Sequence, residues 1–95
     1  MAERHHSTFT ILRRSQVQAE SGYSRSTIYL RIAQGLFTPP VRLGARAVGW
    51  PAEEVAALNR ARIAGNTDRD LRELVQELLR ARGCMRSGPT GTGRT

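Results

Sequence analysis

The sequence of 95 residues has one cysteine, no lysine and few aromatic residues. The single cysteine, Cys84, excludes an intramolecular disulfide, and with the adjacent pair His5 and His6 it provides too few ligands for a metal framework. No apolar run approaches the roughly 20 residues that a membrane-spanning helix needs, and no apolar signal-peptide core follows the N-terminus. These absences predict no metal, no cofactor and no membrane partner. They also predict a location in a reducing cytoplasm.

The sequence offers no candidate catalytic residue. Catalysis needs a nucleophile beside a base, or paired acids in a cleft, and the only two histidines stand next to each other near the N-terminus. Gly91 and Gly93 have no strand before them and no helix after them, so they do not form a phosphate-binding loop. We therefore expect a binding protein and not an enzyme.

Positive charge is in excess and unevenly distributed. Fifteen basic residues, all of them arginine, stand against eight acidic residues, which gives a net charge of +7. Residues 1–50 carry a net +5, whereas residues 51–95 carry a net +2. A GC-rich genome would account for arginine in place of lysine, but not for the surplus of positive charge. The first half of the chain therefore favours a polyanion as partner.

A short amphipathic helix is expected from about Arg25 to Gln34. Ser24 supplies an acceptor for the free amides of its first turn, and Gly35 ends it because glycine adopts positive φ without a Cβ clash. The spacing of apolar residues turns one face toward a core, namely Ile28, Tyr29, Ile32 and Ala33. The opposite face consists of Ser26, Thr27, Leu30 and Gln34, with Arg31 on its flank. Such a face suits a DNA major groove.

A second short helix is expected before this one, from Ser15 to Ser21. Val17 and Ala19 would point inward, and Gly22 would form the turn between the two helices. Helix, glycine turn and second helix together are typical of a helix-turn-helix. Arg13 and Arg14 stand where the first helix begins, so they either touch phosphate or are only solvated.

A β-hairpin is expected after the second helix. Two β-prone runs, Val41–Leu43 and Ala47–Trp50, flank a short turn, and Arg42 and Arg46 make this hairpin basic. Phe9–Leu12 could pair with the hairpin or supply a third strand. Trp50 is the one large side chain able to close the hairpin over the helices, which favours a core role over base stacking. A basic hairpin beside a recognition helix is a wing.

Several short motifs stand in a distinctive order along this region. They are Ser26-Thr27-Ile28-Tyr29, Gly35-Leu36-Phe37, Pro40-Val41-Arg42-Leu43-Gly44, Arg46-Ala47-Val48-Gly49-Trp50 and Glu53-Glu54-Val55. In this order they resemble the small phage and prophage regulators of the AlpA type, within the excisionase and MerR-like winged-helix group, from roughly Ile11 to Ile63. The sequence departs from the family pattern at Leu30, where arginine commonly follows the Ile-Tyr pair, and at Thr38, where proline commonly follows the phenylalanine. The resemblance implies a DNA-binding regulator of a mobile element, or an excision factor that bends DNA for an integrase.

Two further helices are expected after the hairpin. The first runs from about Pro51 to Ala64, with Pro51 in its first position and Glu53 and Glu54 favouring the positive end of its dipole. Gly65-Asn66 breaks it, and Thr67 then caps a run with an apolar stripe: Leu71, Leu74, Val75, Leu78 and Leu79. Such a helix is marginal alone in water, so the stripe packs either on its own domain or on a second chain, and we favour the second chain.

The predicted protein is mainly α-helical, a winged helix-turn-helix with a β-hairpin wing and a C-terminal amphipathic helix. We expect a mobile N-terminus (1–8), the DNA-binding domain (9–64), the oligomerisation helix (65–82) and a disordered tail (83–95). The expected partners are double-stranded DNA, a second copy as dimer or DNA-templated filament, and an integrase if the protein is an excision factor. An interaction module acting through the leucine stripe is the alternative of another class, and no aromatic pair favours RNA. The expected DNA-binding residues are Arg13, Arg14, Ser24, Arg25, Ser26, Thr27, Leu30, Arg31, Gln34, Arg42 and Arg46.

Overall fold

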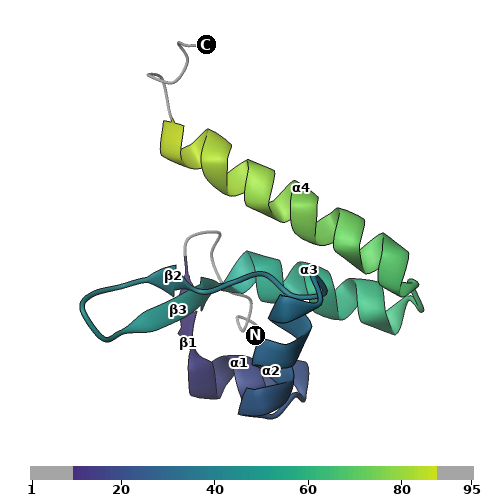
Figure 1. The fold of residues 1–95 in the computed structure, drawn as a ribbon, viewed down its shortest axis with the longest axis horizontal. Coiled ribbons are helices and arrows are strands. Elements are labelled where there is room, and N and C mark those ends of the chain that lie inside the picture. Colours follow the sequence, from purple (N-terminus) through teal and green to yellow (C-terminus); the bar gives the residue numbers. More distant parts are fainter. Residues whose placement is uncertain (1–9, 88–95) are drawn as a thin grey trace, which may run out of the picture.

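The computed structural model describes residues 10–87, with the side chains of residues 10–83. The elements in chain order are β1 (Ile11–Arg13), α1 (Arg14–Ser21), α2 (Arg25–Ala33), β2 (Val41–Arg42), β3 (Val48–Pro51), α3 (Ala52–Ile63) and α4 (Asp68–Ser87). Four helices and a small three-stranded antiparallel sheet confirm the predicted winged helix-turn-helix fold class. In Figure 1, α3 lies between α4 on one side and α1 with α2 on the other, and the hairpin of β2 and β3 projects from one end.

The sheet has the order β1-β3-β2, so the first strand pairs with the far arm of the hairpin. Leu12 is opposite Trp50 and Arg42 is opposite Val48, both in antiparallel register. The amide of Leu43 donates to the carbonyl of Ala47 at 2.8 Å and closes the hairpin. The predicted wing and its third strand are therefore both present.

The helix-turn-helix forms where the sequence predicts it. Gly22 has φ +80° between α1 and α2, and Gly35 has φ +78° after α2, so both turns use the left-handed conformation that glycine tolerates. Ser24 Oγ accepts the amide of Thr27 at 3.2 Å as the predicted N-cap. Val17 is fully buried as expected, but Ala19 is exposed. Ser21 takes the inward position, with its hydroxyl donating to the carbonyl of Val17 at 2.7 Å.

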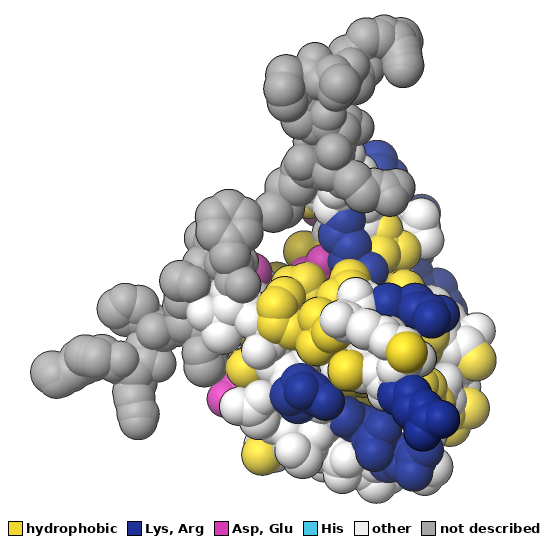
Figure 2. All heavy atoms as spheres, turned by 90° about the vertical axis from the view of Figure 1, so that its left-hand side faces the viewer, with side chains coloured by type: hydrophobic (Ala, Val, Ile, Leu, Met, Phe, Trp, Pro, Cys, Tyr) yellow, Lys and Arg dark blue, Asp and Glu magenta, His cyan; other side chains and the backbone are white. Residues whose placement is uncertain are grey.

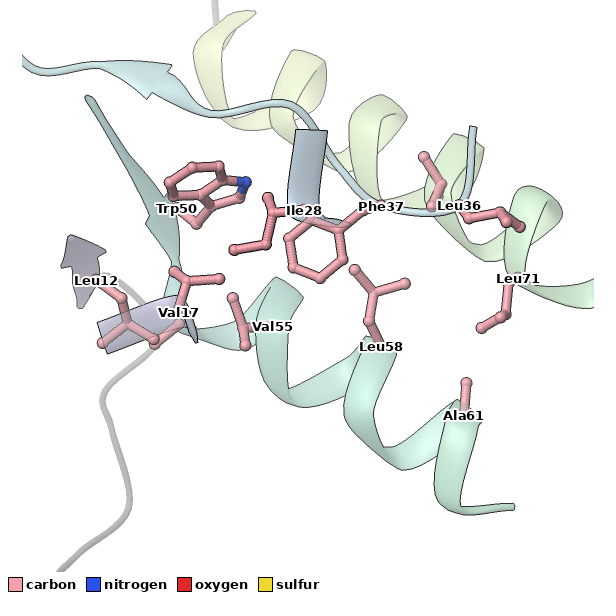
Figure 3. Close-up of a cluster of buried hydrophobic side chains, with 12 residues drawn as sticks. Leu12, Val17, Ile28, Leu36, Phe37, Trp50, Val55, Leu58, Ala61 and Leu71 are labelled. Atoms are coloured by element: carbon pink, nitrogen blue, oxygen red, sulfur yellow. The ribbon is translucent and has the colours of Figure 1, made fainter. Parts of the chain in front are cut away.

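One core joins the sheet to all four helices. Trp50 is its largest member, and its indole N–H donates to the carbonyl of Thr38 at 2.8 Å, which confirms a core role. Figure 3 shows Trp50 and Phe37 facing the side chains of Ile28 from α2 and Val55 from α3. Tyr29, expected inward, is 39% exposed and meets Trp50 only edge-on, with 6.4 Å between ring centroids.

The two C-terminal helices begin and end close to the predicted positions. Pro51 caps α3 and ends β3, one residue before the helical position expected for it. Gly65 has φ +82° after α3, and Thr67 exchanges side-chain to backbone hydrogen bonds with Asp70, each of 3.2 Å, at the start of α4. The backbone of α4 continues to Ser87, five residues beyond the expected end. The expected mobile N-terminus (1–8) and residues 88–95 of the expected disordered tail lie outside the described residues.

The leucine stripe of α4 packs on its own domain, which is the alternative to the favoured second chain. Pairing with a second chain stays a prediction. Leu71 is 8% exposed and Val75 2% exposed, and both belong to the common core. Leu74, Leu78 and Leu79 are partly buried against the same core. Figure 3 shows Leu71 of α4 and Ala61 of α3 at one end of this cluster. The reason is that α3 and α4 pack against each other, with Leu58 and Ala61 of α3 in the same core as the stripe of α4.

Within residues 10–87 no helix has the length and apolarity to span a membrane.

Candidate nucleic-acid interface

The exposed face of α2 carries polar side chains around one leucine and has no acidic group. Arg25, Ser26 and Gln34 are exposed along it, and Leu30 is 55% exposed near its middle. The hydroxyl of Ser24 is engaged locally, since it donates to Thr27 Oγ1 at 2.9 Å while accepting the amide of Thr27. The capping hydrogen bonds therefore fix the start of α2, whereas the side chains of its outer face are directed to solvent.

Arg31 lies folded back on the molecule and not extended from α2. Its guanidinium lies 5.7 Å from the ring centroid of Tyr23, and its Nη1 donates to Gln34 Oε1 at 3.3 Å. Its Nε is buried and has no hydrogen-bond partner among the described residues. An unpaired buried N–H is costly, so this group adds nothing to the stability of the inward position. Turning outward would expose that N–H to a new acceptor and would give up the contacts with Tyr23 and Gln34.

The C-terminal end of α2 is fixed by α4. Arg72 Nε donates to the carbonyl of Gln34 at 2.9 Å, where the last carbonyls of α2 lack partners within the helix. The aliphatic part of Arg72 also packs beside Gly35, because a Cβ there would lie 3.7 Å from Arg72 Cγ.

A basic hollow of about 310 Å³ lies between the start of α1 and the hairpin. It is lined by Arg13, Arg14, Ser15, Arg46 and Val48, so the structure brings Arg46 beside an arginine pair that is distant from it in the sequence. The first turn of α1 contains no acidic residue, and its free amides add positive potential. A helix N-terminus surrounded by arginines is suited to a phosphate group.

The hairpin carries the remaining predicted arginines. Arg42 and Arg46 are both exposed, one on β2 and the other in the turn before β3. Figure 2 looks at the side of the molecule from which the hairpin projects, and shows several groups of arginine with little acidic surface between them. The outer face of α2, the basic hollow and the hairpin are together named the basic face below.

Interactions far from the basic face hold its parts in place. Arg82 of α4 pairs with Glu54 of α3, and its Nη2 also donates to the carbonyl of Pro39 at 2.7 Å, just before β2. On the other side, Arg62 Nη1 donates to the carbonyl of Ser21 at 2.9 Å, at the turn of the helix-turn-helix. Both contacts tie a loop next to α2 or the hairpin to the helical layer behind it.

The sequence interpretation missed the residues that complete or position the basic face. Ser15 and Val48 line the hollow, and only the adjacency of Ser15 to Arg13 and Arg14 was a signal for this. Arg72 and Arg82 act across 38 and 43 residues of sequence, and no local pattern indicates such contacts. Within the residues whose structure is described, no group of three or more histidine, cysteine or acidic residues is arranged to hold a metal ion.

Comparisons with known proteins cover this same region. A family model described as "Prophage CP4-57 regulatory protein (AlpA)" matches residues 10–62, from β1 almost to the end of α3. The chain is also 48% identical over 54 residues to a protein of Enterobacteria phage P4 described as "Uncharacterized protein ORF88". That match covers 57% of this chain and 61% of the length of the phage protein. No solved structure matches the chain.

Proposed function

The chain belongs to the AlpA family of prophage regulatory proteins, and from this premise we propose that it regulates a phage or mobile element by binding specific double-stranded DNA. In this proposal α2 enters the major groove and the hairpin follows the neighbouring backbone or minor groove. The arginines of the hollow, Arg13, Arg14 and Arg46, contact phosphate, which fixes the position of the protein without reading sequence.

One observation carries the proposal: residues 21–52, which contain α2 and the hairpin, have no acidic residue and four arginines. Their exposed side chains lie on the basic face together with the positive end of α1. A positively charged surface attracts a polyanion and repels basic proteins. The shape fits duplex DNA, because an α-helix fills a major groove and a projecting hairpin reaches the adjacent backbone.

The alternative of a protein-interaction module is less well supported. It relied on the leucine stripe, and the best-buried members of that stripe, Leu71 and Val75, are inside the chain's own core. Any self-association on DNA would leave these two residues where they are and would use another surface.

Binding to duplex DNA at increasing salt concentration tests the proposal. Neutralising several phosphates releases counterions, so the logarithm of the association constant should fall linearly with the logarithm of the salt concentration. The proposal fails if no duplex is bound at low salt, or if affinity does not respond to salt. Mapping bound sites in the native host separates a regulator, which occupies promoters, from an excision factor acting with an integrase, which occupies an attachment site.

A further inference from the structure

Leu30 is an exposed leucine in the middle of a surface that is otherwise suited to a charged partner. It is 55% exposed on the outer face of α2, and it is not among the apolar side chains packed against the core of the described residues. Single exposed leucines are common on protein surfaces, so exposure alone carries no functional argument. The functional argument comes from two further observations. Leu30 lies on the basic face, and it differs from the other exposed apolar residues.

Other exposed apolar side chains of this face have a structural role. Ile11 of β1 and Leu43 just after β2 are 38% and 43% exposed, and both cover Gly49 of the central strand β3. A Cβ at Gly49 would lie 2.5 Å from Ile11 Cγ2 and 3.0 Å from Leu43 Cδ1. Tyr29, beside Leu30, meets the edge of Trp50. Among the described residues, no comparable contact gives the side chain of Leu30 a structural role.

The chemistry around Leu30 selects the kind of partner that covers it. Ser26 and Gln34 lie one turn before and one turn after it, and both are exposed. No acidic residue occurs on α2, whose arginines are Arg25 and Arg31. The partner is therefore anionic overall but offers an apolar group between polar ones. In the major groove of DNA the one apolar group on a base edge is the C5 methyl of thymine.

We propose that Leu30 contacts the C5 methyl group of a thymine in the major groove and so sets the preferred base at one position of the target site. This assignment rests on the DNA-binding function proposed above. Ser26 and Gln34 stand about 6 Å along the helix axis on either side of Leu30. Their polar groups therefore reach bases within about two base pairs of the thymine.

Replacing thymine by deoxyuracil tests the contact directly. This change removes the methyl group and leaves base pairing, backbone charge and every hydrogen-bonding group of the groove in place. A preferred duplex is first selected from a random library with the full-length wild-type protein, and each thymine is then replaced in turn. Replacement at one thymine per bound protein should weaken wild-type binding about fourfold, the effect of losing burial of one methyl group.

Leu30→Ala completes the test as a double-mutant cycle. This variant should bind the thymine and deoxyuracil duplexes equally well at the critical position, while the dependence on salt stays that of the wild type because no charge is removed. Ile63→Ala, which removes an 86% exposed apolar side chain at the end of α3, is the matched control and should keep the full sensitivity to deoxyuracil.

The outcomes separate this proposal from the one on which it rests. Salt-sensitive binding with no loss at any deoxyuracil position overturns the role of Leu30 and leaves the DNA-binding function standing. Equal sensitivity of wild type and Leu30→Ala overturns it as well, since the methyl group is then read by another residue. A wild-type protein that binds no duplex overturns both proposals. Because the wild-type measurement needs no variant, the absence of a loss at any deoxyuracil position overturns the proposal however Leu30→Ala folds.

Discussion

The guanidinium of Arg82 donates to both carboxylate oxygens of Glu54, at 2.7 and 2.6 Å, across a sequence separation of 28 residues. The side chains are 23% and 7% exposed, so the pair is largely shielded from water. Bidentate pairs of this kind fix both distance and orientation. Here they fix α4 relative to α3, and through the additional bond to Pro39 they fix the chain that leads into the hairpin.

Glu54→Gln should therefore lower the free energy of unfolding by about 1.5 to 3 kcal/mol, because Arg82 loses a charged acceptor while its own charge stays shielded. Urea denaturation measures the change. Glu53→Gln, at the exposed neighbouring position, is the control and should remain within about 0.5 kcal/mol of the wild type. Equal midpoints for the two variants would contradict a stabilising role of the pair.

Arg46→Ala should weaken binding to all duplexes alike and reduce the salt slope by about 1, because a phosphate contact carries no sequence information. Arg69→Ala removes the same charge from α4, where the side chain is 87% exposed and paired with Glu73 at 3.8 Å, so it should leave the slope unchanged. Fluorescence anisotropy at a series of salt concentrations distinguishes the two variants. A similar small loss in both would reduce the role of Arg46 to net charge.

Arg31→Ala should flatten the preference at one base pair by about 1 to 3 kcal/mol, if the side chain turns outward and reads a base in the groove. Arg62→Ala is a suitable control, since Arg62 also lies over the ring of Tyr23, at 4.3 Å, but bonds to Ser21 behind the basic face. It should lower stability and leave the preference intact. Competition binding with single-base variants of the selected duplex provides the measurement, and an unaltered preference in Arg31→Ala would limit Arg31 to its contact with Tyr23.

Leu71→Ala should lower the free energy of unfolding by about 2 kcal/mol or more, because it leaves a cavity between α4 and the core. The melting temperature of the wild type should not depend on protein concentration, since the stripe is buried within one chain and not between two. Ile63→Ala, at an exposed position, should show neither effect. A melting temperature that rises with concentration would return the stripe to the oligomerisation role first expected for it.

The elements of the fold and their order were determined by the sequence itself. Ser24, Gly22 and Gly35 set the ends of the helices through bonds and dihedral angles that involve only neighbouring residues. The hairpin and the break at Gly65 and Asn66 follow from local turn chemistry in the same way. Because these effects act within a few residues, α2 and the hairpin could both be predicted before any contact was known.

The tertiary structure alone decided what covers each apolar or charged group. Periodicity identified the stripe of α4 as buried, but not whether α3 or a second chain buries it, since both satisfy the same pattern. It placed Tyr29 inward, yet Trp50 fills that space and leaves Tyr29 at the edge. The pairing of Arg82 with Glu54 and of Arg72 with the end of α2 depends on helices that meet only after folding. Such contacts are set by packing geometry over long sequence separations, on which local propensity has no influence.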